Sequence, residues 1–162
     1  MDLTIRPFRN QDAEAISLLY RVSVEQLGSR YYAPAQITAW ASLTPEPQRL
    51  GEQMRDGRLR LLAVDGGDRV LGFADLEYGG DGSGHLDYFY IHPDAAKCGV
   101  GRALCAAIEQ AANNAGLSLI DAEASEAAKA FFIRQGYQER QRRDLMLGDV
   151  PIHNYAMRKT LI

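Results

Sequence analysis

The stretch YFYIHPDAAKCGVGR, residues 88–102, joins a strand pattern to a helix pattern through a loop that contains two glycines. The apolar strand ends at Ile91, because Pro93 cannot continue a strand's hydrogen-bond ladder, and a long amphipathic helix follows the loop. Glycines let the backbone approach a ligand closely, and the unpaired amides at a helix start attract anions. This stretch therefore predicts a phosphate or pyrophosphate site, with added positive charge from Lys97 and Arg102.

The glycine spacing alone leaves two interpretations open. Gly99-x-Gly101 lacks the third glycine of a dinucleotide fingerprint, and the stretch lacks the Gly-Lys-Ser/Thr ending of a P-loop. A tight turn between a strand and a helix would use the same glycines without binding any ligand. The surrounding sequence is needed to distinguish a ligand site from a turn.

Hydrophobic periodicity predicts a mixed α/β fold on both sides of this stretch. Asn10 is a good N-cap for a helix that Gly28 ends, and Pro34 begins a second helix. The patterns predict strands near residues 3–5, 59–64, 70–78, 85–91, 117–122, 138–147 and 152–161, and helices at 13–27, from 34, within 48–55, at 99–115 and at 127–134. We expect these elements to form a single domain over residues 1–162.

Composition and charge exclude several classes of protein. With 24% charged residues and a formal net charge of -3, the chain lacks the basic surplus of a nucleic-acid binder. The one basic cluster, Arg140, Arg142 and Arg143, lies beside acidic residues and is expected to be a solvated strand face. No apolar run is long enough to span a bilayer, and the first residues do not form a secretion signal. We expect a cytoplasmic protein that binds neither nucleic acid nor membrane.

Neither the cysteines nor the histidines form a metal-binding pattern. Cys98 and Cys105 match no zinc or redox spacing, and we expect them to be free thiols. His85, His92 and His153 do not form a pair spaced for one helix face. We therefore expect no metal site.

Residues 88–102 resemble motif A of the GNAT superfamily, the Gcn5-related N-acetyltransferases. In that family a strand ending V-x-P is followed by [RQ]-x-x-G-x-[GA] and an amphipathic helix, and residues 91–93 and 96–101 are similar. Ala96 replaces the usual Arg or Gln, and Lys97 is the candidate to compensate. The resemblance extends to residues 10–27 and 125–137, and the segment from Arg30 to Trp40 is similar to an uncharacterised bacterial branch.

The resemblance implies a fold and a reaction. The fold is a central, mostly antiparallel sheet of about seven strands, splayed at the middle and flanked by about four helices. The reaction is the transfer of an acetyl group from acetyl-CoA to a primary amine, by direct attack in a ternary complex. The implied contacts of acetyl-CoA are the backbone of Phe89, Tyr90 and Ile91, the loop residues Lys97, Cys98, Gly99, Val100, Gly101 and Arg102, and the flanking residues Ser125, Lys129 and Phe132.

The attacking amine must lose a proton, so the reaction needs a base or a chain of water molecules. Strand alternation places His85 and Asp87 on one face, together with Phe89 and Ile91, which makes His85 and Asp87 the candidate bases. Both also have structural explanations, His85 as a solvated residue and Asp87 as a partner of backbone amides.

The leaving thiolate takes a proton from a tyrosine in many family members. Phe132 stands at the matching position and has no proton to give. Tyr155 is the candidate replacement, although a half-buried aromatic on a strand is the alternative interpretation. A thiolate also leaves without much help, because the pKa of a thiol is only about 8.5.

The acceptor amine is expected between the first helices and the last hairpin, as the resemblance implies. The candidate residues there are Arg30, Tyr31, Tyr32, Trp40 and His153, with Arg30 able to bind a substrate carboxylate. Ordinary core packing is the alternative for the aromatic members. We expect a small-molecule acceptor. A protein lysine or N-terminus as acceptor, or a non-catalytic acyl-CoA-binding or sensor domain, are alternatives. Edge strands near the C-terminus also suggest a homodimer.

Overall fold

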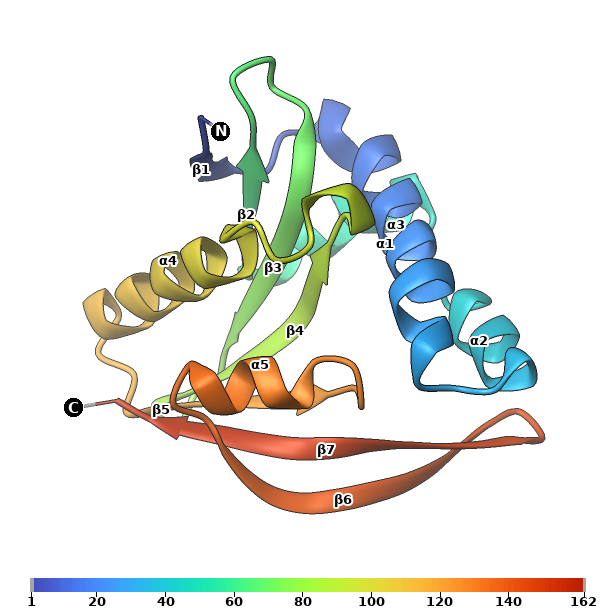
Figure 1. Ribbon diagram of the computed structural model, residues 1–162. Coiled ribbons are helices and arrows are strands. Elements are labelled where there is room, and N and C mark those ends of the chain that lie inside the picture. Colours follow the sequence, from blue (N-terminus) through green and yellow to red (C-terminus); the bar gives the residue numbers. More distant parts are fainter. Residues whose placement is uncertain (1, 162) are drawn as a thin grey trace.

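Seven strands form one twisted sheet in the computed structural model, which describes residues 2–161 (Figure 1). The strands are β1 (Thr4–Pro7), β2 (Leu59–Val64), β3 (Val70–Tyr78), β4 (Ser83–Ile91), β5 (Leu119–Ala124), β6 (Gln138–Leu147) and β7 (Val150–Thr160). Their order is β1-β2-β3-β4-β5-β7-β6, and every neighbouring pair is antiparallel except β4 and β5. The predicted mixed, mostly antiparallel sheet is confirmed.

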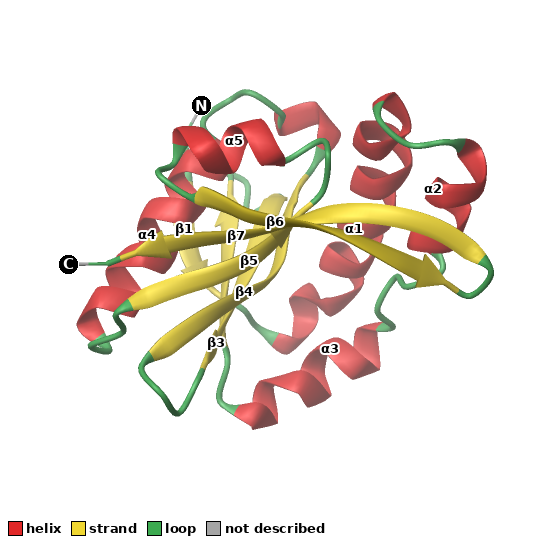
Figure 2. Cartoon of the chain, turned by 90° about the horizontal axis from the view of Figure 1, so that it is seen from below, coloured by secondary structure: helices red, strands yellow, loops and turns green. Residues whose placement is uncertain are grey.

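Helices cover both faces of this sheet (Figure 2). They are α1 (Ala13–Leu27), α2 (Pro34–Ala41) and α3 (Pro47–Gln53) on one side, and α4 (Val100–Asn114) and α5 (Lys129–Arg134) on the other. One core joins α1 and α3 to the sheet through residues such as Ile16 and Phe73, and a second joins α4 and α5 to it through residues such as Leu104 and Phe132. Within residues 2–161, no helix has the length and apolar character that crossing a membrane requires.

The bounds of the predicted strands and helices agree with the structure to within about two residues, but the predicted N-cap of the first helix differs. Asn10 lies in a 3-10 turn, and Asp12 is the residue that precedes α1. The Asp12 carboxylate accepts hydrogen bonds from the Arg9 amide at 2.8 Å and from Arg6 Nη1 at 2.8 Å. The prediction of Asn10 as the N-cap of this helix is therefore wrong, because the turn moves the helix start to Ala13.

The parallel pairing of β4 with β5 covers only the first half of β4. It begins at Ser83 opposite Leu119 and ends at Leu86 opposite Ala122. Beyond this point β4 still pairs with β3, and β5 still pairs with β7, but the two strands have parted. Figure 1 shows β4 rising away from β5 and β7, which run across the lower part of the molecule. The backbone of residues 87–91 is thus left without a neighbour on its β5 side.

A β-bulge in β4 begins where the strands part. Ala74 of β3 pairs with Phe89 and Leu76 pairs with Leu86, so Asp75 stands opposite two residues of β4, 87 and 88. A bulge of this kind bends the strand and increases its twist. The extra residue therefore directs the end of β4 away from β5.

The bulge also changes which side chains of β4 share a face. Asp87 remains with His85 on the α1 side, where Tyr90 packs against the core of α1 and α3. Phe89 and Ile91 pack on the opposite side, against the core of α4 and α5. The predicted common face of His85, Asp87, Phe89 and Ile91 is therefore wrong, because the bulge reverses the alternation after Asp87.

A buried ion pair holds the strand opposite the bulge. Asp75 accepts hydrogen bonds from Arg60 Nε at 2.7 Å and Arg60 Nη2 at 2.6 Å, and neither side chain has any exposed surface. Arg58 Nη1 also donates to Asp75, at 3.0 Å, and Arg60 Nη1 donates to the Leu50 carbonyl of α3. A buried charge is costly unless it is paired, so this network restricts Asp75 to one position.

A methyl group at Gly72 tests the close packing of α4 on β3. The added Cβ of Gly72→Ala would lie 2.9 Å from Ile91 Cδ1, 3.0 Å from the Tyr90 carbonyl and 3.1 Å from Leu104 Cδ1. Such overpacking lowers the free energy of unfolding by about 1–3 kcal/mol, measured by urea denaturation. Gly80→Ala is the matched control, because nothing lies within 4 Å of its added Cβ. Equal stability of the two variants would contradict the packing described.

Candidate active site

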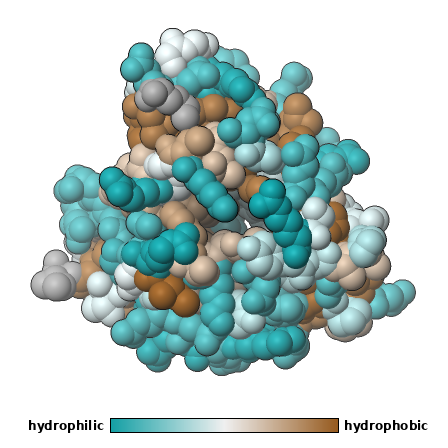
Figure 3. All heavy atoms as spheres, viewed as in Figure 1, coloured by the Kyte–Doolittle hydropathy of each residue, from teal (hydrophilic) through white to brown (hydrophobic). Residues whose placement is uncertain are grey.

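A cavity of about 350 Å³ fills the gap between the parted ends of β4 and β5, and we call it the splay cavity. Its walls come from the end of β4, the loop before α4, the end of β5, helix α5 and the end of α1. Figure 3 shows a hollow near the centre of this face, between the side formed by α4 and α5 and the side formed by α1. An extended ligand in the gap can pair with the free backbone of β4 as an added strand does.

The loop before α4 forms one end of the splay cavity through its backbone. Gly99 precedes α4 in the left-handed conformation with a φ of 85°, and an added Cβ there would meet nothing within 4 Å. Gly101 lies against the Phe131 ring, which is 3.1 Å from an added Cβ. Ala103 makes the first amide bond of the helix, to the Gly99 carbonyl at 3.0 Å. The amides of residues 100–102 precede this bond and have no helical acceptor, as an anion site requires.

Positive side chains line the splay cavity, and two of them, Lys97 and Arg102, lie in the loop before α4 and at the start of α4. Arg30, Lys97, Arg102 and Arg134 all line the cavity. Lys97 has a φ of 61°, which is unusual for a residue with a Cβ. Cys98 is exposed and its thiol donates to the Ala96 carbonyl, whereas Val100 is buried in the core, so neither side chain lines the cavity. The cations and the free amides together suit a ligand that carries several phosphates.

A second cavity of about 390 Å³ lies between helices α1 and α2 and the β6–β7 hairpin, and we call it the hairpin cavity. Its walls are rich in aromatic side chains, including Tyr20, Tyr32, Tyr88 and Tyr90. Five residues line both cavities and so form the junction between them: Trp40, Asp87, Tyr90, Glu123 and Ser125. A ligand in one cavity and a ligand in the other would therefore meet at two carboxylates.

The two carboxylates at the junction come from the two strands that part. Asp87 Oδ2 accepts a hydrogen bond from Arg58 Nη1 at 2.8 Å, and about a third of its side chain is exposed. Glu123 lies 2.6 Å from His85 Nε2 and 3.3 Å from Arg143 Nη1. The interaction with His85 lowers the pKa of Glu123 below its usual range, so the carboxyl group is ionised at neutral pH.

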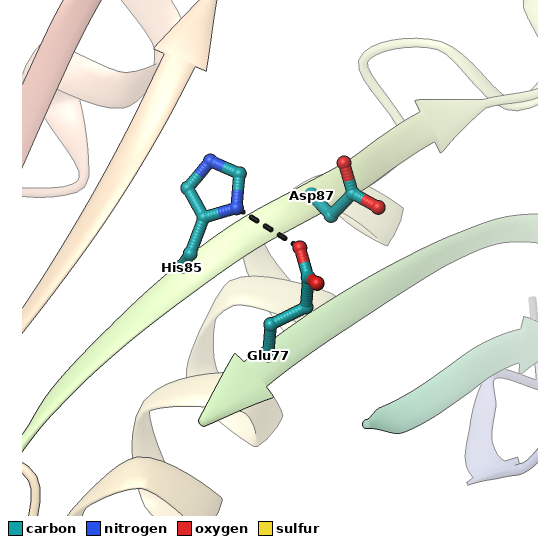
Figure 4. Close-up of side chains that lie close together, drawn as sticks. All are labelled: Glu77, His85 and Asp87. Atoms are coloured by element: carbon teal, nitrogen blue, oxygen red, sulfur yellow. Dashed lines mark hydrogen bonds and ion pairs between the residues drawn. The ribbon is translucent and has the colours of Figure 1, made fainter. Parts of the chain in front are cut away.

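His85 is held between two carboxylates and lines neither cavity. Its Nδ1 lies 3.1 Å from Glu77 Oε1, as Figure 4 shows, and its Nε2 lies 2.6 Å from Glu123 Oε2. The hydrogen bond to Glu123 is the main reason that the pKa of His85 is raised to about 9. The imidazole therefore keeps its proton at neutral pH. The role of His85 as a base stays a prediction.

Glu77, His85 and Asp87 lie close enough to place one ligand atom each within 4.8 Å of the others (Figure 4). The positive charge that faces this group is the Arg58 guanidinium, which donates to Asp87 at 2.8 Å and to Glu77 at 3.4 Å. Arg58 also donates to Asp56 and Asp75. This arrangement is an ion-pair network, in which a guanidinium and an imidazolium neutralise the carboxylates.

Two predicted site residues have their partners outside the splay cavity. Lys129 pairs with Glu139 at 2.5 Å, and its Nζ lies 4.0 Å from the centre of the Tyr155 ring. The Tyr155 hydroxyl donates to Glu126 Oε2 at 2.7 Å, and this bond raises the pKa of Tyr155. Neither Lys129 nor Tyr155 lines either cavity. Their contacts with a ligand stay predictions.

The remaining predicted positions divide between the two cavities. Tyr32, Trp40 and His153 line the hairpin cavity. Arg30 and Tyr31 line the splay cavity instead, because the 3-10 turn Gly28–Arg30 carries them past the end of α1. Ser125 lines both cavities, and Phe132 lines the splay cavity with its ring 5.2 Å from that of Phe89.

Several residues that line the cavities were not predicted from the sequence. They are Tyr20, Tyr88, Glu123, Phe131, Arg134 and Asn154. Glu123 could have been proposed from the sequence, because a charged side chain between buried neighbours near the end of a strand is unusual. Phe131 could also have been proposed, since it lies next to Phe132 in the same helix. No sequence pattern indicates Asn154, because its role depends on how β7 pairs with its neighbours.

Comparison with known proteins agrees with this geometry. The profile of the acetyltransferase (GNAT) domain matches residues 29–159. The uncharacterised N-acetyltransferase YafP of Escherichia coli strain K12 is 23% identical over 138 residues, which are 85% of this chain and 82% of that protein.

Solved structures give the same result. A GCN5-related N-acetyltransferase from Rhodopseudomonas palustris has a TM-score of 0.88 and 30% identity, covering 99% of this chain and 97% of that one. The PaiA N-acetyltransferase from Thermoplasma acidophilum, solved in complex with coenzyme A, has a TM-score of 0.80 and 19% identity, covering 99% of this chain and 100% of that one.

The titration of His85 tests the ion pairs at the junction. NMR should give a pKa of about 9 for His85 in the folded protein. Because this lies above the ordinary 6.5, these ion pairs stabilise the fold fully below about pH 6.5 and are lost as the pH rises through 9. Glu123→Gln should lower this pKa more than Glu77→Gln does, since Glu123 makes the larger contribution. A pKa near 6.5 in the unaltered protein would contradict the assignment.

Proposed function

The chain belongs to the GNAT acetyltransferase family, and we propose that it acetylates a small primary amine bound in the hairpin cavity, with acetyl-CoA bound in the splay cavity. It is an acetyl-CoA-dependent N-acetyltransferase. The observation that carries the proposal is the junction, where Asp87 and Glu123 line both cavities. A thioester that enters from one side meets an amine that enters from the other beside two carboxylates.

The splay cavity has the features that acetyl-CoA requires along its length. The free amides of residues 100–102 and the side chains of Lys97 and Arg102 face the phosphates at one end. The backbone of residues 89–91 accepts the amide-bearing pantetheine arm in the middle, because this part of β4 has no partner in β5. Phe131 and Phe132 supply an apolar wall opposite that backbone. The acetyl group then lies at the junction.

Asp87 is our proposed acceptor of the amine's proton. Of the two bases considered from the sequence, Asp87 lines both cavities and His85 lines neither. The role of His85 is to fix Glu123, which lies 2.6 Å away. Glu123 in turn attracts the cationic amine to the junction. The bound ammonium first loses one proton, to Asp87 directly or through one water molecule, and this frees the lone pair of its nitrogen. As the nitrogen then bonds to the acetyl carbon, a second proton leaves it through water to solvent, and one hydrogen stays on the amide nitrogen.

The leaving thiolate needs no acid from the chain in this proposal. Phe132 has no proton to give, and the Tyr155 hydroxyl is bound to Glu126. A thiolate is a good leaving group at neutral pH, since the pKa of a thiol is about 8.5. Its bond to the acetyl carbon breaks as the amide forms, and the thiolate takes its proton from solvent.

The way in which α2 meets the hairpin supports a small acceptor. The Tyr32 hydroxyl donates to the His153 carbonyl at 2.9 Å and accepts from the Glu126 amide at 2.8 Å. Gln36 Nε2 donates to the Pro151 carbonyl at 3.0 Å. These bonds tie α2 to β7 on one side of the hairpin cavity, and they leave less room for a folded protein than for a small molecule.

Gly99→Glu tests the binding of coenzyme A. Its carboxylate would repel the phosphates, so the Kd for coenzyme A in calorimetry should rise by about 100-fold or more. Gly116→Glu is the matched control, because Gly116 ends the same helix with a φ of 74° and also has open space around an added Cβ. It should bind coenzyme A as the unaltered protein does. Unchanged binding by Gly99→Glu would exclude the proposed phosphate site.

Asp87→Asn tests the proton acceptor. With acetyl-CoA and an accepted amine, kcat should fall by about 10²–10⁴-fold, while the Kd for coenzyme A stays within about twofold. Asp56→Asn is the control, because Asp56 also binds Arg58 and lines neither cavity. Its kcat should change by less than about threefold. Full activity of Asp87→Asn would assign the proton to another group.

A further inference from the structure

We infer that the acceptor is a primary amine with an apolar body of aromatic size and no carboxylate, and that Asn154 determines this specificity by accepting a hydrogen bond from the amine. The inference rests on the proposed function, because it names the substrate class for the hairpin cavity. Four features carry it: an unpaired oxygen, the aromatic walls, the charge of the lining and the apolar strands of the hairpin.

Asn154 carries a buried polar atom without a partner. Its Oδ1 has essentially no exposed surface and no hydrogen bond, and among residues 2–161 no other buried side-chain nitrogen or oxygen lacks a partner. Asn154 lines the hairpin cavity. It lies two residues before Ala156, which pairs with Glu123, so the two side chains share one face of the sheet. An unpaired buried oxygen is costly unless a ligand supplies the missing donor.

Three residues that line this cavity carry acceptor oxygens. They are the carboxylates of Asp87 and Glu123 and the amide oxygen of Asn154. A primary ammonium group has three N–H donors. It can give one to each acceptor on arrival, and it keeps the bond to Asn154 after one proton has passed to Asp87. A tertiary amine cannot do so, and it also has no N–H to lose.

Aromatic rings line the same cavity. Tyr20 and Tyr90 lie 4.4 Å apart between ring centres, and Tyr32 contacts Trp40 edge to face at 5.6 Å. The centres of the Trp40 and Tyr90 rings are 6.5 Å apart. Aromatic faces attract a cation and pack well against a flat apolar group. The walls therefore suit an ammonium group that is joined to a short arylalkyl body.

The charges of the lining oppose a second, negative group on the acceptor. Among the described residues that line the hairpin cavity, none is a lysine or an arginine, whereas Asp87 and Glu123 are both present. Arg143 lies on the same face but is paired with Glu123 at 3.3 Å, and Arg58 is paired with Asp87 at 2.8 Å. Within this lining the carboxylate of an amino acid would face like charges, and neither Arg143 nor Arg58 is free to bind it.

The hairpin strands and the α2–α3 connection complete the cavity with apolar side chains. Leu43 lies after α2, Leu145 and Leu147 lie on β6, and Ile152 lies on β7. Leu145 pairs with Ile152 across the hairpin, on the same face as Asn154. The body of the acceptor thus extends from the polar junction along an apolar wall. A volume of about 390 Å³ accommodates an arylalkylamine.

Matched substrates test the inference most simply. With the full chain and acetyl-CoA, thiol release should be followed for phenethylamine and tryptamine, and for phenylalanine and tryptophan, which differ from them only by a carboxylate. The kcat/KM of each amine should exceed that of its amino acid by about 100-fold. Equal or greater kcat/KM for the amino acids would overturn the inference, and so would acetylation of peptide N-termini in preference to the amines.

Asn154→Leu and Asn154→Asp test the role of the unpaired oxygen. Leucine has a similar size but no acceptor, so the KM for phenethylamine should rise by about 10-fold while the Kd for coenzyme A is unchanged. The melting temperature should stay equal or rise, because an unpaired buried oxygen is removed. Asn154→Asp keeps an acceptor and should keep the KM within about threefold. A lower melting temperature with an unchanged KM in Asn154→Leu would show that Asn154 is only structural.

Different results would contradict the proposed substrate class and the proposed acetyltransferase function. Acetylation of some other amine or peptide, with no preference for arylalkylamines, would overturn the substrate class and leave the acetyltransferase function standing. Stabilisation of the protein by coenzyme A without acetylation of any amine or peptide would overturn both. Rapid acetylation of phenethylamine by the unaltered protein, with the predicted loss in Asn154→Leu, supports both.

Discussion

The account depends on one constraint, which is that β4 and β5 pair in parallel for only four residue pairs. Past Leu86 the bulge opposite Asp75 bends β4, and the buried pairing of Asp75 with Arg60 holds β3 in place behind it. The parting of the strands frees the backbone of β4 and opens a passage through the sheet. Both cavities exist because of this passage, and the two carboxylates at its junction come from the strands that part.

Charge is divided along the passage in a way that matches the two ligands. Cations and free helix amides lie at the end lined by the loop before α4, where phosphates are expected. Carboxylates and aromatic rings lie at the junction and in the hairpin cavity, where an ammonium group is expected. Salt bridges and hydrogen bonds from Arg58 and His85 stabilise those carboxylates in the free protein. The amine therefore reaches a preformed site and not a pair of repelling charges.

The sequence predicts the parts of this site that depend on neighbouring residues alone. The strand that stops before Pro93, the glycines at 99 and 101 and the start of α4 are all local patterns, and the structure has them where predicted. The exchange of faces at Phe89 could not be predicted, because a bulge is a mismatch between two strands. Glu123 and Asn154 were missed for a related reason, since the place of Glu123 depends on the pairing of β5 with β7 and that of Asn154 on the pairing of β6 with β7. The pairing of Lys129 with Glu139 and of Tyr155 with Glu126 could not be predicted either, because these are contacts between residues distant in the sequence.

A crystal structure of the protein with coenzyme A and an arylalkylamine bound together tests the central claim most directly. The account predicts that the pantetheine arm pairs with the backbone of residues 89–91 and that its sulfur lies at the junction of the two cavities. The amine nitrogen should lie on the other side of the sulfur, beside Asp87 and Glu123. A pantetheine arm outside the gap between β4 and β5, or an amine bound away from both carboxylates, would contradict the account.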